Sequence, residues 1–150
     1  MGRFSCSMAM ILGLAALLAT VGCGGREGEI TPTAARLQAI INGYLDYAVA
    51  SGEAPANEEQ LRACIAGSPA FLVAMSQHGI GTIDELFVSP RDGHRFVIVF
   101  GVPVTFAPGT LAAPVVYERN GQDGTRFVAF ANGTVECMEE ELDMLMLGAL

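Results

Sequence analysis

The chain contains two histidines, His78 and His94, and each lies beside a glycine in a segment expected to be a loop. Histidine is the side chain best suited to acid–base chemistry near neutral pH, and it is a common metal ligand. Three residues could form a catalytic triad, with Ser89 as the nucleophile, His94 as the base and Asp92 as the acid that orients it. No Gly-x-Ser-x-Gly turn accompanies the serine, however. The sequence also lacks zinc-binding patterns such as His-Glu-x-x-His or Cys-x-x-Cys. We therefore predict no catalytic residue, metal site or cofactor; the alternative is a small periplasmic hydrolase or metal-binding enzyme that uses His94 and Asp92.

Carboxylate and amide oxygens gather in two places. The segment around residues 120–123 offers Asn120, Gln122 and Asp123 as oxygen ligands for Ca²⁺, but calcium sites use six to eight oxygens and usually several carboxylates. We predict an ordinary turn there. Near the C-terminus five carboxylates fall close together: Glu136, Glu139, Glu140, Glu141 and Asp143. Three of them would occupy the first turn of a closing helix and complement its dipole, with a cation or a basic partner as the alternative.

The N-terminus has the features of an export signal. One positive charge at Arg3 precedes an uncharged run up to Gly25, and the strongly apolar part of that run is too short for a typical membrane-spanning helix. Thr20 and Gly22 are small residues just before Cys23. This pattern resembles the lipobox of bacterial lipoproteins, in which the cysteine is acylated and becomes the new N-terminus, although the lipobox prefers leucine at the position of Thr20. We expect a signal peptide over residues 1–22, a lipid on Cys23 and a tether over residues 23–30. The alternatives are cleavage by an ordinary signal peptidase and an uncleaved anchor.

The four cysteines fit this assignment. Cys6 lies within the signal peptide and Cys23 would carry the lipid, which leaves Cys64 and Cys137 as an even pair. Export places this pair in an oxidising compartment, where disulfides persist. We predict a disulfide between Cys64 and Cys137; two buried thiols are the alternative.

The charge balance limits the classes of partner. Sixteen acidic side chains face eight basic ones, all arginine, and the formal net charge is −8. Proteins that bind nucleic acid through its phosphates carry the opposite charge, so we expect no nucleic-acid partner. The same charge disfavours docking on anionic lipid through a basic patch. Contact with the membrane is expected through the lipid anchor.

The first half of the mature chain has helical periodicity. Thr31 and Pro32 begin a long amphipathic helix with apolar residues at spacings of three and four, and Gly52 ends it. A capping pattern at residues 57–60 opens a short helix that stops at Gly67. Ser68-Pro69 starts a further turn or two through Phe71, Leu72 and Met75, and residues 82–85 could cap one more turn.

The second half favours antiparallel strands. Residues 95–100 are apolar on both faces, which indicates a central strand. Two further strands are expected over residues 114–119 and 126–131, joined by a glycine-containing turn. Asn132-Gly133 predicts a tight hairpin to a last strand at 134–137, before the closing helix. The fold class is thus α+β: a long N-terminal helix and short helices packed on an antiparallel meander of three to four strands.

Two passages resemble the soluble part of type II secretion pseudopilins and related pilin-like secreted proteins: Pro114-Val-Val-Tyr-Glu and Phe130-Ala-Asn-Gly-Thr-Val-Glu. They follow a long helical segment and its end, with Tyr44, Tyr47, Gly52 and Pro55, which also resembles these proteins. The resemblance implies a pilin-like domain over residues 31–150 that assembles with protein partners. No prepilin cleavage pattern accompanies Phe4, so we do not expect processing or polymerisation as a pilin.

These features together predict a lipid-anchored protein of the cell envelope that faces the periplasm. By analogy with sorting in other lipoproteins, Gly24 after the cysteine favours the outer membrane. The expected role is a non-enzymatic interaction or structural module with an envelope protein partner. A periplasmic ligand-binding domain is a further alternative, which would require an apolar pocket.

Overall fold

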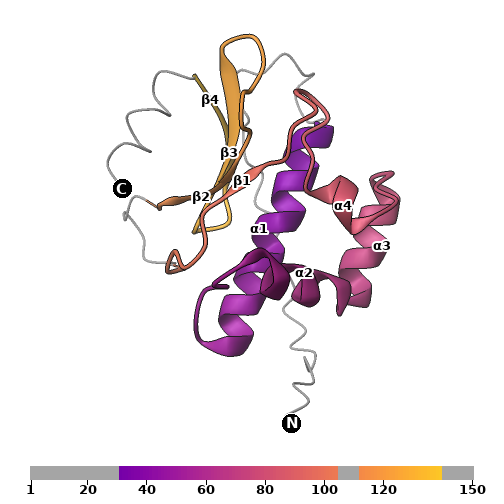
Figure 1. Cartoon of the computed structure of the whole chain (residues 1–150), viewed down its shortest axis with the longest axis vertical. Helices are drawn as coiled ribbons and strands as arrows, with labels where there is room; N and C mark the ends of the chain where they lie inside the picture. The colour runs from indigo at the N-terminus through magenta and orange to yellow at the C-terminus, as the bar shows by residue number, and fades with distance from the viewer. Residues whose placement is uncertain (1–30, 105–111, 140–150) are drawn as a thin grey trace.

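The computed structural model describes residues 31–104 and 112–139, which form an α+β fold (Figure 1). A 20-residue helix and three shorter helices pack on a four-stranded antiparallel sheet with the strand order β1-β2-β3-β4. The elements in chain order are α1 (Pro32–Ser51), α2 (Glu58–Ala66), α3 (Pro69–Gln77), α4 (Ile83–Leu86), β1 (Val97–Ile98), β2 (Pro114–Tyr117), β3 (Thr125–Phe130) and β4 (Val135–Glu139). The expected fold class is confirmed. The predicted signal peptide and tether lie outside the described residues.

The long helix α1 begins and ends where the sequence predicts. The Thr31 hydroxyl oxygen accepts a hydrogen bond from the Ala34 amide at 3.2 Å, which satisfies one of the unpaired donors of the first turn. Gly52 ends the helix with φ 79°, a left-handed conformation that glycine adopts without steric cost. Neither α1 nor any other helix in the described ranges has the length and apolar character required to span a membrane.

The short helices also follow their local signals. Asn57 caps α2 by accepting from the Gln60 amide at 3.0 Å, and Thr82 and Glu85 form a reciprocal capping box at α4. In a full capping box the Gln60 side chain would accept from the amide of the cap residue Asn57. Here it accepts from the amide of Ala56, one residue earlier. Arg62 then joins α2 to α4 through an ion pair with Asp84 at 2.5 Å.

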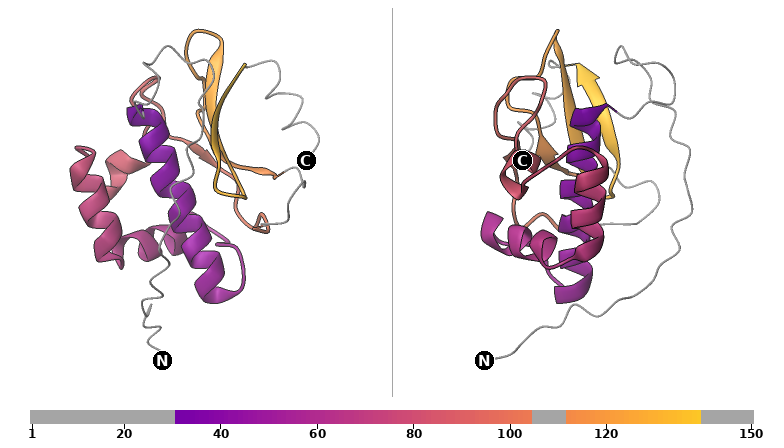
Figure 2. Two further views of the ribbon diagram at one scale, coloured as in Figure 1. Left: turned by 180° about the vertical axis from the view of Figure 1, so that it is seen from behind. Right: turned by 90° about the vertical axis from the view of Figure 1, so that its right-hand side faces the viewer.

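The core lies between α1 and the sheet. One side of α1 covers the sheet and the other side contacts the short helices, as Figure 1 and Figure 2 show from three directions. Four α1 side chains at helical spacing are fully buried: Leu37, Ile40, Ile41 and Tyr44. Phe127 and Ala129 of β3 and Val116 of β2 meet them from the sheet. The amphipathic pattern of α1 therefore produces a helix buried on two sides, which is why its stripe is wide.

A glycine allows α1 and α2 to approach closely. A Cβ atom at Gly43 would lie 2.7 Å from Cγ1 of Ile65, inside the closest approach of two carbon atoms. Ile65 is fully buried, so its side chain has little room to move.

The prediction of a central strand over residues 95–100 is wrong. The strand β1 is only two residues long and lies at the edge of the sheet, paired with β2 alone. Both ends of the apolar run leave the sheet: the Phe96 amide donates to the Phe87 carbonyl at 2.9 Å, and the Gly101 amide donates to the Pro55 carbonyl at 3.0 Å. Phe96 and Phe100 still pack on the core. The run is apolar on both sides because its ends are buried against helices and loops.

The other strands agree with expectation to within a few residues. Gly133 has φ 87° in the turn between β3 and β4, as the Asn132-Gly133 pair predicts. Glu139 is the last residue of β4 and not the first turn of a helix, because it pairs with Thr125 in the sheet. The rest of the predicted closing helix lies outside the described residues.

Candidate functional site

Ser89, Asp92 and His94 lie in a tight loop between α4 and β1. Val88 and Arg95 form an isolated antiparallel bridge at its base. The Ser89 amide donates to the His94 carbonyl at 2.8 Å, and the Gly93 amide donates to the Ser89 carbonyl at 2.9 Å. Gly93 has φ 70°, so a glycine closes this loop. These backbone hydrogen bonds hold the conformation of the loop without help from its side chains.

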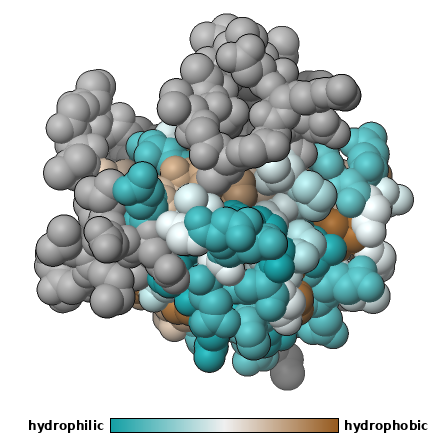
Figure 3. Space-filling view, turned by 90° about the horizontal axis from the view of Figure 1, so that it is seen from above, coloured by the Kyte–Doolittle hydropathy of each residue, from teal (hydrophilic) through white to brown (hydrophobic). Residues whose placement is uncertain are grey.

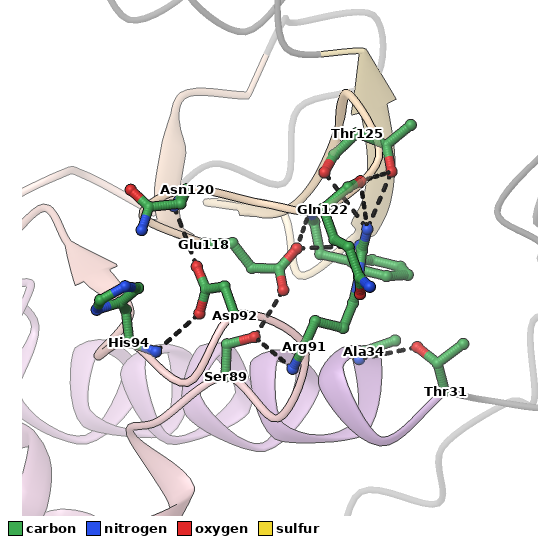
Figure 4. Close-up of polar contacts among 11 residues, drawn as sticks. Thr31, Ala34, Ser89, Arg91, Asp92, His94, Glu118, Asn120, Gln122 and Thr125 are labelled. Atoms are coloured by element: carbon green, nitrogen blue, oxygen red, sulfur yellow. Dashed lines mark hydrogen bonds and ion pairs between the residues drawn. The ribbon is translucent and has the colours of Figure 1, made fainter.

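A buried carboxylate holds this loop against the β2–β3 hairpin (Figure 4). Glu118 directly follows β2 and is fully buried. Its Oε1 accepts from the Ser89 hydroxyl at 2.6 Å, and its Oε2 accepts from the Arg91 guanidinium at 3.1 Å and from the Phe127 amide at 2.9 Å. A buried charge is tolerated when it is paired and hydrogen-bonded on both oxygens, and Glu118 meets that condition.

Arg91 extends from the loop across the end of the hairpin. Its Nη2 donates to the Gln122 carbonyl at 2.9 Å and to the Thr125 hydroxyl at 3.0 Å. Its guanidinium lies 5.0 Å from the centre of the Phe127 ring, within the range of a cation–π contact. The arginine thus satisfies both the buried carboxylate and the turn of the hairpin.

Asp92 ties the loop to the same hairpin at a second point. Its Oδ1 accepts from the His94 amide at 2.8 Å and its Oδ2 from the Asn120 amide at 3.1 Å. The contact between Asp92 and His94 is therefore made by the histidine backbone, and the His94 side chain is exposed. His78 follows the end of α3 and is also exposed. Both histidines lie in surface loops, as predicted.

Ser89, Asp92 and His94 lie close together in this loop, but their hydrogen bonds stabilise the loop and its contact with the hairpin. The Ser89 side chain is buried, donates to Glu118 and accepts from the Arg91 amide at 3.1 Å. A nucleophilic serine needs its hydroxyl directed at a base and open to substrate. The geometry corresponds to a brace between loop and hairpin, which we call the Glu118 brace: Ser89, Arg91 and Glu118.

The two charged members of the brace, Arg91 and Glu118, were not predicted from the sequence. Arg91 and Glu118 are 27 residues apart, and no local sequence pattern links them. The only signal was Glu118 directly after three apolar residues of a predicted strand.

The segment around residues 120–123, which we expected to be an ordinary turn, forms the turn between β2 and β3. Gln122 and Thr125 bond to each other at 2.9 and 3.0 Å, with Asp123 at φ 55° and Gly124 at φ 71° between them. The Gln122 carbonyl accepts from the Arg91 guanidinium. Gly121 is tightly packed as well, since a Cβ there would lie 2.3 Å from the Thr125 carbonyl oxygen. Across residues 31–104 and 112–139, no three His, Cys, Asp or Glu side chains gather in a way that could hold a metal ion.

The predicted cysteine sites are placed only in part. Cys64 lies half-buried on α2, and Cys137 lies on β4 with its side chain against the core. Both elements contact α1. The disulfide between Cys64 and Cys137 stays a prediction, as does acylation of Cys23, which lies outside the described residues.

The helix α3 carries an apolar surface that the sequence did not reveal. Its nine residues, Pro-Ala-Phe-Leu-Val-Ala-Met-Ser-Gln, include no charged side chain, yet only Met75 is buried. Leu72 and Val73 are 45% and 58% exposed. Elsewhere apolar exposure is more scattered: in the face shown in Figure 3, hydrophilic residues cover most of the described surface and hydrophobic ones form small patches.

Two shallow depressions open to solvent on the described surface. One, of about 450 Å³, is lined by residues of α2 and by Ile83; the other, of about 470 Å³, lies between the end of α1 and residues 101–104. Neither contains a histidine or a member of the Glu118 brace. Ligand pockets that bind tightly enclose most of the ligand, which an open depression does not do.

Comparisons of the chain with protein-family models, with curated proteins and with solved structures found no match.

Proposed function

We propose that this protein is a lipid-anchored, non-enzymatic module of the cell envelope that binds another envelope protein through α3. The observation that carries the proposal is the exposed apolar surface of this helix. Leu72 and Val73 are adjacent in sequence and about half exposed, on a helix without charged residues. Contiguous apolar residues on the surface of a globular protein mark interaction sites more often than isolated ones do.

The packing of α3 explains why this surface is available. The helix contacts α1 and α2 on one side, where Met75 enters the core. Phe71 is half-buried against the same core. Leu72 and Val73, the next two residues, lie on the exposed side of the helix. Phe71 and Met75 therefore pack on the core, whereas Leu72 and Val73 stay in contact with water. Their exposure has a free-energy cost that a bound partner would remove.

The membrane part of the proposal rests on the sequence. The charge-free run before Cys23, and the small residues Thr20 and Gly22, support export and acylation. A tether of residues 23–30 would keep the domain within about 28 Å of the membrane surface when fully extended. The domain would then meet proteins of the same membrane at high effective concentration.

The polar cluster supports a structural role over a catalytic one. Every member of the Glu118 brace is engaged in contacts that join the loop to the hairpin. Both oxygens of Asp92 accept backbone amides. The hydrolase alternative with His94 and Asp92 gains no supporting geometry from these contacts.

Affinity capture tests the proposed surface. The full-length chain, with an affinity tag at the C-terminus, is expressed in its native membrane, solubilised in mild detergent and recovered, and co-purifying proteins are identified by mass spectrometry. We expect a reproducible envelope protein. Leu72→Ser with Val73→Ser should reduce its recovery about tenfold or more, since truncation of a central hot-spot residue costs about 2 kcal/mol or more and a tenfold loss corresponds to about 1.4 kcal/mol.

Val49→Ser is the matched control. Val49 is 71% exposed near the end of α1, so the variant removes an exposed apolar side chain at another place on the surface. Recovery should be unchanged. Equal loss of the partner in both variants, or retention in both, would contradict a binding surface on α3.

The anchor has its own test. Mass spectrometry of the mature N-terminal peptide should find Cys23 as the first residue with an added diacylglyceryl mass. An unmodified Cys23 with a free amino group would refute acylation without affecting the α3 experiment.

A further inference from the structure

Three of the four asparagines in the chain are followed directly by glycine: Asn42, Asn120 and Asn132. An Asn-Gly pair can react without an enzyme, because glycine has no side chain to obstruct the approach of its backbone nitrogen to the asparagine carboxamide. The sequence alone does not rank the three pairs. The structure does, because the reaction requires a backbone amide and a carboxamide that are both free to move.

The reaction joins the backbone nitrogen of the glycine to Cγ of the asparagine. The bond between Cγ and the carboxamide nitrogen breaks, and ammonia leaves with the proton of the backbone amide. The product is a cyclic succinimide. Water then opens the ring at either of its carbonyl groups, which gives aspartate or isoaspartate. Water is the only co-reactant, and nothing is oxidised or reduced.

The pair at Asn42 lies inside α1. Gly43 is buried there, and the backbone amides in the interior of a helix are engaged in its hydrogen bonds. The Asn42 carboxamide oxygen accepts from the Gln38 side chain at 3.0 Å. Ring closure would remove the glycine nitrogen from the helix, so the fold of α1 opposes this reaction.

The pair at Asn132 is held by hydrogen bonds on both reacting groups. The Gly133 amide donates to the Phe130 carbonyl at 2.8 Å. The Asn132 carboxamide oxygen accepts from the Thr134 amide at 3.0 Å and from the Thr134 hydroxyl at 2.8 Å. Attack on Cγ would have to break the first bond and turn the carboxamide away from the other two. The hairpin turn between β3 and β4 therefore protects this pair.

The pair at Asn120 has neither kind of protection. Asn120 is exposed, and Figure 4 shows its side chain directed away from the Glu118 brace. Within residues 31–104 and 112–139, no hydrogen bond engages its carboxamide or the Gly121 amide. The backbone amide of Asn120 donates to Asp92, but that nitrogen takes no part in ring closure.

The turn itself requires the glycine that makes Asn120 reactive. Gly121 has φ 65°, and a Cβ atom at this position would lie 2.3 Å from the Thr125 carbonyl oxygen. A residue with a side chain would therefore have to displace the backbone of β3. The fold thus keeps an Asn-Gly pair at an exposed position.

We propose that Asn120 is the asparagine of this chain that converts spontaneously to aspartate and isoaspartate, and that the conversion loosens the loop of residues 89–94 from the β2–β3 hairpin. The Asp92 carboxylate accepts from the Asn120 amide at 3.1 Å, and this bond joins the loop to the hairpin. The new carboxylate at position 120 has the same charge as Asp92 and repels it. Isoaspartate also adds a methylene group to the main chain. This assignment does not depend on the proposed function.

Ageing of the folded protein tests the site. The full chain is purified in mild detergent and incubated at mildly alkaline pH, either native or unfolded in urea. Peptide mass spectrometry follows the conversion of amide to acid at each pair, after digestion at acidic pH, where the amide nitrogen stays protonated and the reaction is slow. We expect Asn120 to react several-fold faster than Asn42 and Asn132 in the native protein. In urea the three rates should be similar, because the following residue is the same.

Three results of this experiment would overturn the proposal. The first is a native protein in which Asn42 or Asn132 reacts as fast as Asn120. The second is a native protein in which Asn120 does not react. The third is an equal preference for Asn120 in urea, because the selectivity would then come from the local sequence and not from the hydrogen bonds of the fold.

The effect on the loop is measured with Asn120→Asp, which supplies the carboxylate without ageing. This variant should raise the unfolding equilibrium constant about two- to fivefold, the range measured for exposed charge pairs. The increase should disappear in an Asp92→Asn background, because the two groups are then no longer both charged. Asn132→Asp is the matched control, since aspartate there can still accept from both donors of Thr134. An equal increase in the control, or an increase that persists without the Asp92 carboxylate, would contradict the proposed effect.

Hydrogen exchange covers the case in which the Asp92→Asn variant does not fold. The amides of residues 94 and 120 both donate to Asp92, so their exchange should become faster after ageing of the wild-type chain. Exchange of residues 37–44 in α1 should not change. Asn120→Gln keeps a carboxamide but would have to close a larger ring, so ageing should leave its exchange unaltered. Equal changes in aged wild type and aged Asn120→Gln would show that the loop loosens for another reason and would refute the proposal.

Discussion

The Ser89 hydroxyl and the Glu118 carboxylate lie 2.6 Å apart inside the protein, although 29 residues separate them in the chain. This hydrogen bond and the Arg91 ion pair hold the loop after α4 against the β2–β3 hairpin. The cluster that most resembled an active site in the sequence is thus a connection between two halves of the fold.

Removal of the Glu118 carboxylate should destabilise the protein strongly. Glu118→Ala leaves the Arg91 charge, the Ser89 hydroxyl and the Phe127 amide without their shared acceptor, so the free energy of unfolding should fall by about 3–5 kcal/mol. Ser89→Ala removes one donor to the carboxylate and one acceptor for the Arg91 amide and should cost less, about 1.5–3 kcal/mol. Urea denaturation followed by circular dichroism measures both. A loss below that of Ser89→Ala would contradict a structural role for Glu118.

Tyr44 should make stability dependent on alkaline pH. Its hydroxyl donates to the Val102 carbonyl at 3.0 Å and accepts from the Val102 amide at 2.9 Å. Burial raises the pKa of Tyr44 above 10, with the Val102 hydrogen bond opposing part of the increase. The folded state therefore favours the neutral phenol, and this contribution is complete below pH 10 and is lost as the pH rises toward the raised pKa.

Denaturation at pH 8, 10 and 11 checks this dependence. Tyr44→Phe should lower the free energy of unfolding by about 1–2 kcal/mol at pH 8, because it leaves the Val102 backbone groups without a partner. The difference between wild type and variant should shrink at pH 11. Tyr47→Phe, at a half-buried tyrosine on the same helix, is the matched control. A constant difference at all three pH values would refute the titration of Tyr44.

The substitution Gly43→Ala should destabilise the wild-type protein but stabilise a variant in which Ile65 is shortened. In the wild-type background Gly43→Ala places a Cβ 2.7 Å from Ile65 Cγ1, and overpacking of this kind costs about 1–3 kcal/mol. In an Ile65→Ala background the space is open, and alanine should gain about 1 kcal/mol over glycine through helix propensity. Thermal unfolding of the four proteins decides the sign. The same sign in both backgrounds would show that the helices do not meet at this glycine.

The disulfide predicted between Cys64 and Cys137 can be tested on the mature protein. Thiol titration under denaturing, non-reducing conditions, combined with peptide mapping, should find these two cysteines linked. In the chain-entropy model a closed loop of about 73 residues contributes about 4 kcal/mol, so reduction should lower the melting temperature markedly. Two titratable thiols at Cys64 and Cys137, or a map that links either to another cysteine, would refute this pair.

Local signals in the sequence were sufficient for most of the elements. Thr31 and Gly52 set the limits of α1, Thr82 and Glu85 form the capping box of α4, and Gly133 makes the last hairpin turn. Each of these features depends on residues within four positions of one another, because caps and turns satisfy backbone groups of the adjacent residues. A reader of the sequence can therefore locate them without knowing the fold.

Features that join distant segments required the tertiary structure. The sequence showed that residues 95–100 are apolar, but only the bonds of Phe96 to Phe87 and of Gly101 to Pro55 reduce that run to a two-residue edge strand. The exposure of Leu72 and Val73 likewise depends on how much of α3 the core can use. Glu118 follows three apolar residues, but these neighbours alone do not distinguish it from a surface glutamate near the end of a strand. Its burial depends on Ser89 and Arg91, which approach it only after the loop and the hairpin have packed together, since a charge is stable inside a protein only where distant groups converge to satisfy it.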